Sequence, residues 1–149
     1  MKSQGMALAA VFLVTSTFPV LAQEAVLTVQ KSDKHGDYIA DANGRALYMF
    51  EADTQGKGDG GAVSACTGEC VGEWPPFRTQ GTTGVSAGAA GDLVGALKRQ
   101  DGTTQITYNG WPLYYFYPDE NTGDITGHDF EDFGAEWYLL TPEGEKAHD

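Results

Sequence analysis

Two cysteines are the residues of this chain best suited to redox or metal chemistry. Cys66 and Cys70 are separated by three residues, none of which is a lysine, arginine or histidine that would lower the pKa of a thiol. In an oxidising compartment this spacing favours a disulfide that fixes the local turn. Cβ atoms four residues apart on a regular helix are about 5–6 Å apart, and a disulfide needs about 3.5–4.5 Å. We therefore expect Gly68 to break or tighten any helix here, and a reversible redox pair or a soft-metal ligand pair are the alternatives.

Two aspartates each come five residues after a tyrosine. Asp53 follows Tyr48, Asp119 follows Tyr114, and each aspartate precedes a loop that contains glycine. An aspartate in this position caps a turn by accepting hydrogen bonds from backbone N–H groups. The tyrosine five residues earlier is a candidate partner across the turn, and cation binding is the alternative role for these carboxylates.

The acidic loops near the end of the chain hold the other candidate metal ligands. Oxygen ligands on flexible loops suit Ca²⁺, and the candidates are Asp119, Asp124, His128 and Asp129. Their spacing does not match the EF-hand, because position 5 counted from Asp119 is a glycine. Solvated negative surface is the simpler interpretation, so we expect no cofactor and keep a bound cation as the alternative. There is no H-E-x-x-H motif and no P-loop, so the sequence does not indicate an enzyme.

Composition excludes two classes of partner. The chain of 149 residues carries 9 basic and 21 acidic side chains, a net charge of −12. Binding to nucleic acid or to anionic lipid needs a basic surface instead. The apolar share of 41% fills a hydrophobic core, and the length suits one domain. We therefore expect the partner to be an unidentified protein or small molecule.

The first residues have the pattern of a signal peptide. Lys2 supplies a positive charge, Met6–Val14 is an apolar stretch too short to span a bilayer, and Val20-Leu21-Ala22 places small residues around a cleavage site. We expect cleavage after Ala22, which removes residues 1–22 and leaves 23–149 as a single exported domain. No cysteine stands at this site for acylation, and no later apolar stretch suggests membrane insertion, so the mature protein is expected in the periplasm or the medium.

An internal repeat covers most of the mature chain. Asn43–Asp53 and Asn109–Asp119 match at six of eleven positions with a constant offset of 66 residues. Each copy is followed by a Glu-Trp pair, which ends at Trp74 in the first copy and at Trp137 in the second. The domain is therefore expected to consist of two related halves that share one core. The expected repeats span residues of about 38–80 and 97–142.

The turn signals and the apolar alternation predict β-structure. Asn43-Gly44 and Asn109-Gly110 each favour a two-residue type I′ hairpin turn, because both central residues of that turn need a positive φ. The fold class is therefore all-β and mainly antiparallel, a small single domain of two pseudo-repeated β-hairpin halves with a short helical or looped segment around the cysteines. The remaining expected elements are a strand at Ala25–Gln30, a three-stranded meander over 97–116, a strand at Trp137–Thr141, a short helix within 64–73 and a flexible connection over 81–91.

The strand that leaves each hairpin is apolar on both faces. Such strands are usually buried on both sides, and an exposed aromatic platform for a ligand is the alternative. Trp74 and Trp137 are predicted to pack onto these strands and to close the core of their own half as equivalent residues. The repeated motif residues are Leu47, Tyr48, Phe50 and Asp53 in the first copy and Leu113, Tyr114, Phe116 and Asp119 in the second.

The order of these motifs resembles a known bacterial family. Leu-Tyr-x-Phe-x-x-Asp occurs twice, and Cys-x3-Cys followed by Trp-Pro-Pro lies between the copies, within a stretch from Tyr38 to Pro142. This arrangement resembles the "secreted repeat of unknown function" family, which has a tandem Y-x4-D motif. The resemblance implies an exported protein but no activity. Many members of the family are lipoproteins, and this chain lacks the cysteine that such an anchor needs.

Two functions remain open from the sequence. The first is an exported structural or binding module of the periplasm or cell surface, without enzymatic activity. The second is a metal-linked or electron-transfer accessory protein that uses Cys66 and Cys70 or the acidic loops.

Overall fold

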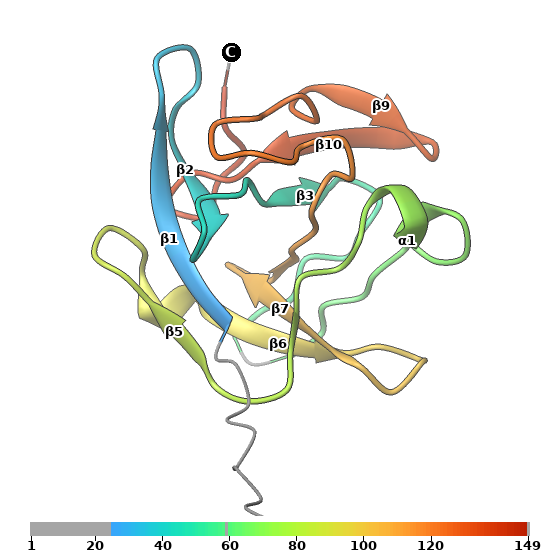
Figure 1. The fold of residues 1–149 in the computed structure, drawn as a ribbon. Coiled ribbons are helices and arrows are strands. Elements are labelled where there is room, and N and C mark those ends of the chain that lie inside the picture. Colours follow the sequence, from blue (N-terminus) through green and yellow to red (C-terminus); the bar gives the residue numbers. More distant parts are fainter. Residues whose placement is uncertain (1–24, 59, 149) are drawn as a thin grey trace, which may run out of the picture.

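The computed structural model describes residues 25–58 and 60–148, so the expected signal peptide, residues 1–22, lies outside the described residues (Figure 1). The predicted all-β class is confirmed, since the only helical elements there are one short helix and one 3-10 turn. No helix in these ranges is long and apolar enough to cross a membrane. The elements are β1 (Ala25–Ser32), β2 (Gly36–Asp41), β3 (Tyr48–Phe50), α1 (Cys70–Glu73), β4 (Arg78–Thr79), β5 (Thr83–Val85), η1 (Gly91–Leu93), β6 (Val94–Lys98), β7 (Thr104–Tyr108), β8 (Trp111–Pro112), β9 (Phe130–Asp132) and β10 (Ala135–Leu139).

The strands form three small sheets. Their orders are β2-β1-β5, β3-β10-β9 and β4-β7-β6, with β8 also paired to β7. The meander predicted over residues 97–116 is present in part: β6, β7 and β8 pair in sequence order, but the third strand ends at Pro112, and Tyr114 beyond it forms only isolated bridges. The segment over 81–91, expected to be a flexible connection, instead contains β5, whose Thr83 and Val85 pair in parallel with β1. The β-branched side chains of these two residues favour the extended conformation over a free loop.

The two Asn-Gly turns differ in detail. Asn109-Gly110 has a positive φ at both residues, 49° and 78°, as predicted for a type I′ turn. In Asn43-Gly44 only Gly44 has a positive φ, 79°, so the prediction of a second type I′ turn is wrong. The N–H of Asp41 donates to the carbonyl of Arg45, which leaves a three-residue loop. The carboxylate of Asp41 accepts hydrogen bonds from the N–H of Asn43 in this loop and from the N–H of Arg45 at its end, and so selects the longer turn.

The prediction that the motif strands are buried on both faces is confirmed. Each strand alternates between two hydrophobic clusters, because successive side chains of a strand point to opposite faces. One cluster is aliphatic and includes Leu47, Met49 and Leu113. The other is aromatic and includes Tyr48, Phe50, Tyr114, Phe116, Trp74 and Trp137.

The two motifs meet at the centre of the molecule. The N–H of Tyr48 donates to the carbonyl of Tyr114 at 2.8 Å, and the N–H of Tyr114 donates to the carbonyl of Tyr48 at 3.0 Å. These reciprocal bonds make the two motifs antiparallel neighbours and relate the repeats by an approximate twofold axis.

The Trp segment of each repeat pairs with the motif of the other repeat. Strand β10, which carries Trp137 of the second repeat, pairs with β3 of the first repeat, and Figure 1 shows the two strands side by side. On the other side of the axis, the N–H of Tyr117 in the second repeat donates to the carbonyl of Glu73 in the first, at 2.8 Å. The two repeats are therefore intertwined, because the motif of each one pairs with the Trp segment of the other.

Candidate functional site

The tyrosine and aspartate of the repeated motif pair across the two repeats. The hydroxyl of Tyr114 donates to Oδ2 of Asp53 at 2.8 Å, and the hydroxyl of Tyr48 donates to Oδ2 of Asp119. The expectation that each aspartate pairs with the tyrosine of its own motif is therefore wrong. We call these two contacts the exchanged pairs.

The antiparallel arrangement of the motifs explains the exchange. The chain that follows one motif runs beside the hairpin turn that precedes the other, as the bond from the N–H of Gly56 to the carbonyl of Gly110 shows at 2.9 Å. On the opposite side, the guanidinium of Arg45 donates to the carbonyls of Asp119 and Phe116. Each aspartate is thereby carried away from its own tyrosine and towards the tyrosine of the other repeat.

Each aspartate also closes the loop that follows it, so the predicted capping role is confirmed. Oδ1 of Asp53 accepts the N–H of Ala65 at 2.7 Å, and Oδ1 of Asp119 accepts the N–H of Thr126 at 3.1 Å. Burial raises the pKa of Asp53 to about 6, although the hydrogen bonds from Ala65 and Tyr114 oppose this shift. Burial is likewise the largest cause that raises the pKa of Tyr114 above its ordinary value.

The two tryptophans form the middle of an aromatic stack. Trp74 and Trp137 are both fully buried, and their rings lie 3.9 Å apart at an interplanar angle of 4°. Phe50 stacks on Trp137 at 4.0 Å, and Phe116 stacks on Trp74 at 4.1 Å, so each tryptophan covers the phenylalanine of the other repeat. Both indole N–H groups donate to Asp132. The prediction of buried, equivalent indoles is confirmed, but each one closes the shared core rather than its own half.

Cys66 and Cys70 form the predicted disulfide. Gly68 has a φ of 62°, and α1 begins only at Cys70, so no regular helix joins the two cysteines, as expected. Both cysteines are buried, with at most 3% of their surface exposed. A thiolate cannot reach such a bond without local opening, which favours a structural disulfide over a redox pair.

The candidate metal ligands do not converge. Asp119 is bound to Tyr48 and Thr126, whereas Asp124 caps the exposed turn at Asn121. Nδ1 of His128 accepts the N–H of Leu139. Within residues 25–58 and 60–148, no group of three or more histidine, cysteine, aspartate or glutamate side chains is placed to hold a metal ion.

A G-x-S-x-G pattern at Gly84–Gly88 also lies outside any catalytic arrangement. Such a serine is a nucleophile when it stands at a sharp turn from a strand into an α-helix. Ser86 instead follows β5 in an exposed turn, where its N–H donates to the carbonyl of Leu27 and its carbonyl accepts the N–H of Ala89. The turn leads to a 3-10 element and not to an α-helix.

One exchanged pair continues as a chain of hydrogen bonds towards the surface. The hydroxyl of Ser64 lies 2.6 Å from that of Tyr114, and Nη1 of Arg99 donates to Ser64 at 2.8 Å. Because Tyr114 donates to Asp53, the consistent direction of donation is from Arg99 to Ser64, from Ser64 to Tyr114 and from Tyr114 to Asp53. The polar chain therefore joins the core to the guanidinium of Arg99.

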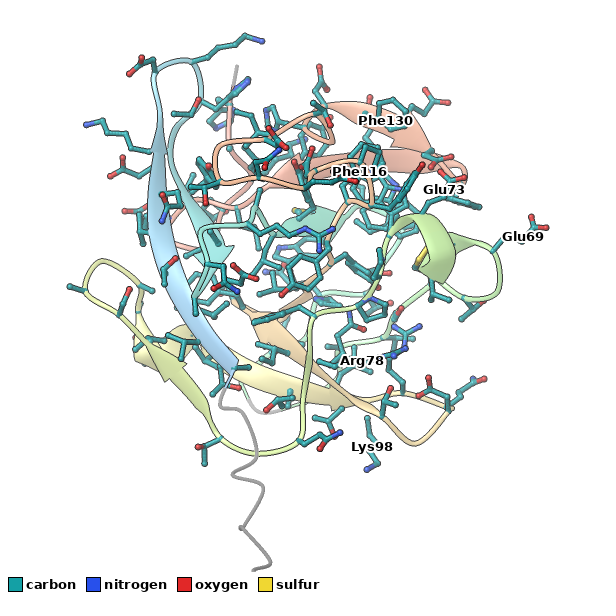
Figure 2. All side chains as sticks on the ribbon, viewed as in Figure 1. Glu69, Glu73, Arg78, Lys98, Phe116 and Phe130 are labelled. Carbon is teal, nitrogen blue, oxygen red and sulfur yellow. A yellow bond between two sulfur atoms is a disulfide. The ribbon has the colours of Figure 1, made fainter. Side chains whose placement is uncertain are left out.

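Ser64 and Arg99 line a cavity of about 370 Å³. The cavity lies between the loop before α1 and the β6–β7 hairpin, and Figure 2 shows Arg78 and Lys98 on this side of the molecule, below α1 in the view. We call it the basic cavity; its side chains include Val63, Ser64, Val71, Arg78, Leu97, Lys98, Arg99 and Asp101. None of these residues belongs to the repeated motif.

Sequence reasoning missed every side chain of the basic cavity. Its residues come from three separate segments, and no motif connects them. The sequence offered one weak indication of this site: Lys98-Arg99 is the only place where two residues that are lysine or arginine are adjacent.

Comparison with known proteins places the chain in a family. No curated protein and no solved structure matches it. The model of a family described as a secreted repeat of unknown function matches residues 29–78 and again residues 95–141. The two matches enclose both motifs, the two stacked tryptophans and most of the described strands, and together they cover more than half of the chain. The resemblance noted from the motifs is confirmed, and the chain belongs to this family of secreted repeats.

Proposed function

We propose that this protein is an exported binding module without enzymatic activity, in which the repeated motif builds the scaffold and the basic cavity receives a small molecule. The observation that supports this proposal is that the motif residues are bonded to one another in the core, whereas the side chains of the basic cavity face an open space. Tyr48, Asp53, Tyr114 and Asp119 are buried and bonded to one another, so they have no free group to offer a ligand. The basic cavity is the hollow into which the polar chain from Asp53 leads.

Export is part of the proposal. The family is one of secreted repeats, and no membrane-spanning helix occurs in the described residues. The N-terminal pattern ending at Ala22 supports passage through the membrane with cleavage there, followed by residence in the periplasm or the medium. The Cys66–Cys70 disulfide agrees with an oxidising compartment. No observation favours the alternative of a metal-linked or electron-transfer protein.

The proposal is tested with a small-fragment screen by methyl NMR on the mature protein. We expect some fragments to shift the methyl signals of Val63, Val71 and Leu97 in a saturable way. Val63 is 56% exposed at the cavity, so Val63→Trp is expected to fill it and to abolish these shifts without unfolding the chain. The matched control is Val85→Trp, since Val85 is 39% exposed on β5 outside the cavity. A screen in which no fragment of any charge moves these signals, or in which Val63→Trp binds as well as Val85→Trp, contradicts the proposal.

A further inference from the structure

We propose that the ligand of the basic cavity is a small amphiphile, an oxyanionic head group attached to an apolar body. This inference rests on the proposed function and adds the chemical class of the ligand. Arg78, Lys98 and Arg99 bind the head group, and the valine and leucine side chains of the cavity contact the body.

The distribution of charge supports an anionic head group. The whole chain has 9 basic and 21 acidic side chains, yet three of those basic side chains line this one cavity. The only carboxylate among the lining side chains is that of Asp101. A local excess of positive charge in an otherwise negative protein attracts anions to this place and repels them elsewhere.

Arg99 gives the cavity a fixed positive charge. Its guanidinium donates to Ser64 Oγ at 2.8 Å, to Gln105 Oε1 at 2.6 Å and to the carbonyl of Cys66 at 2.7 Å. All of these acceptors are neutral, and within the described residues no carboxylate forms an ion pair with Arg99. The carboxylates of Asp53 and Asp101 act on Arg99 electrostatically but form no direct ion pair with it. The guanidinium is thus held in position without a bonded carboxylate, which is the arrangement that an incoming oxyanion completes.

The apolar side chains of the cavity favour an amphiphile over a bare inorganic ion as the ligand. Val63, Val71 and Leu97 line the same cavity, and Val63 is among the most exposed large apolar side chains of the described chain. A volume of about 370 Å³ lies in the range of small-molecule sites. Covering these side chains removes apolar surface from water, a gain that phosphate or sulfate alone cannot provide.

Asp101 competes with the ligand for Arg78. The two side chains form an exposed ion pair with an N–O distance of 3.5 Å. The hydrogen bonds from Thr103 are the largest cause that lowers the pKa of Asp101 below its ordinary value, so this carboxylate stays ionised at neutral pH. Removing its charge releases Arg78 for the head group and leaves the turn intact, since an asparagine oxygen accepts the same bonds from Thr103.

The test compares octanoate with 1-octanol and inorganic phosphate as probes of the mature protein, by isothermal titration and methyl NMR. We expect octanoate to bind at the basic cavity, with 1-octanol and phosphate each at least about tenfold weaker. The double substitution Arg78→Gln and Lys98→Gln should weaken octanoate binding about fivefold or more, because it removes two exposed charges. Lys34→Gln removes one charge from the β1–β2 turn and serves as the control, with no change expected. Asp101→Asn should strengthen binding about twofold to fivefold.

The outcomes separate this inference from the proposed function. Equal binding of octanoate and 1-octanol, or of octanoate and phosphate, overturns the amphiphilic anion and leaves a cavity that binds small molecules. Arg78→Gln/Lys98→Gln binding as well as Lys34→Gln, or Asp101→Asn binding more weakly than the native chain, overturns the role assigned to these charges. Absence of binding by all three probes overturns the inference as well, and the broader fragment screen then decides the proposed function by itself.

Discussion

Asp119 and Tyr48 form a pair that the protein encloses completely, whereas the equivalent pair of Asp53 and Tyr114 opens through Ser64 towards the basic cavity. Both residues of the first pair have 0% exposure, and the hydroxyl of Tyr48 accepts a further bond from the N–H of Gly127. Asp53 keeps 7% of its surface exposed. We call the Tyr48–Asp119 pair the sealed end and the Tyr114–Asp53 pair the open end, and both are built by the same motif.

The difference comes from residues outside the motif. Ala65 and Thr126 are equivalent, because the N–H of each donates to the Oδ1 atom of the motif aspartate. The residue before Ala65 is Ser64, which continues the polar chain to the cavity. The residue before Thr126 is Ile125, which packs against the aromatic core. The motif therefore forms the same buried pair at both ends, and a few non-motif residues decide which end opens towards the cavity.

The largest expected effect comes from the aromatic stack that the two ends share. Trp74→Ala and Trp137→Ala should each lower the free energy of unfolding by about 3–5 kcal/mol, because both fully buried rings leave a large cavity. Similar costs are expected since the two rings occupy equivalent places in the stack. Denaturant titration measures both values, with Tyr117→Ala, at a site 62% exposed, as a control near zero. A tryptophan variant as stable as the control would contradict the conclusion that the two rings stabilise a shared core.

The sealed end should depend more strongly on its aspartate than the open end. Asp119→Ala leaves the Tyr48 hydroxyl without its acceptor in the fully buried core, and should cost about 3 kcal/mol. Asp53→Ala should cost about 1–2 kcal/mol, because Ser64 still bonds Tyr114 and the cavity lies nearby. Unfolding curves at neutral pH compare the two variants. If Asp53→Ala is the more destabilising, the contrast between the two ends is wrong.

The open end should also make stability depend on pH. Burial raises the folded-state pKa of Asp53 to about 6, above an unfolded value of about 3.9. The folded state therefore binds the proton more tightly, and the stability that protonation adds is full below pH of about 4 and is lost as the pH rises to about 6. Between pH 7 and pH 5 the native chain should gain on the order of 1 kcal/mol relative to Asp53→Asn. Matching pH profiles for the two proteins would contradict this role of Asp53.

The local features of this fold were predictable, whereas the exchange between repeats was not. The hairpin at Asn109-Gly110 follows from the φ that this dipeptide adopts, and the disulfide follows from close spacing in an exported chain. The tyrosine of either motif satisfies the chemistry of either aspartate, so the sequence alone does not choose between them. That choice depends on the antiparallel contact of Tyr48 with Tyr114, whose positions lie 66 residues apart.

The basic cavity could not be predicted from the sequence for a similar reason. Val63 and Ser64 precede the helix, Arg78 stands in β4, and Lys98 and Arg99 end β6 or follow it. No spacing rule links these three segments. The segments of Arg78 and Lys98 meet only when β4 and β6 both pair with β7, and Arg99 then binds the segment of Ser64 by hydrogen bonds. The net charge of the chain even points away from an anion site, since an average over all residues conceals a local cluster of cations.

Double-mutant cycles test whether the motif tyrosine and aspartate pair across the repeats. Tyr48→Phe combined with Asp119→Asn should show a coupling energy of about 1 kcal/mol or more, because the two groups share a buried hydrogen bond. Tyr48→Phe combined with Asp53→Asn, the pair within one motif, should be additive to within about 0.5 kcal/mol. Pairing across the repeats predicts coupling in the first cycle only. Coupling in the Tyr48–Asp53 cycle together with additivity in the Tyr48–Asp119 cycle would contradict it.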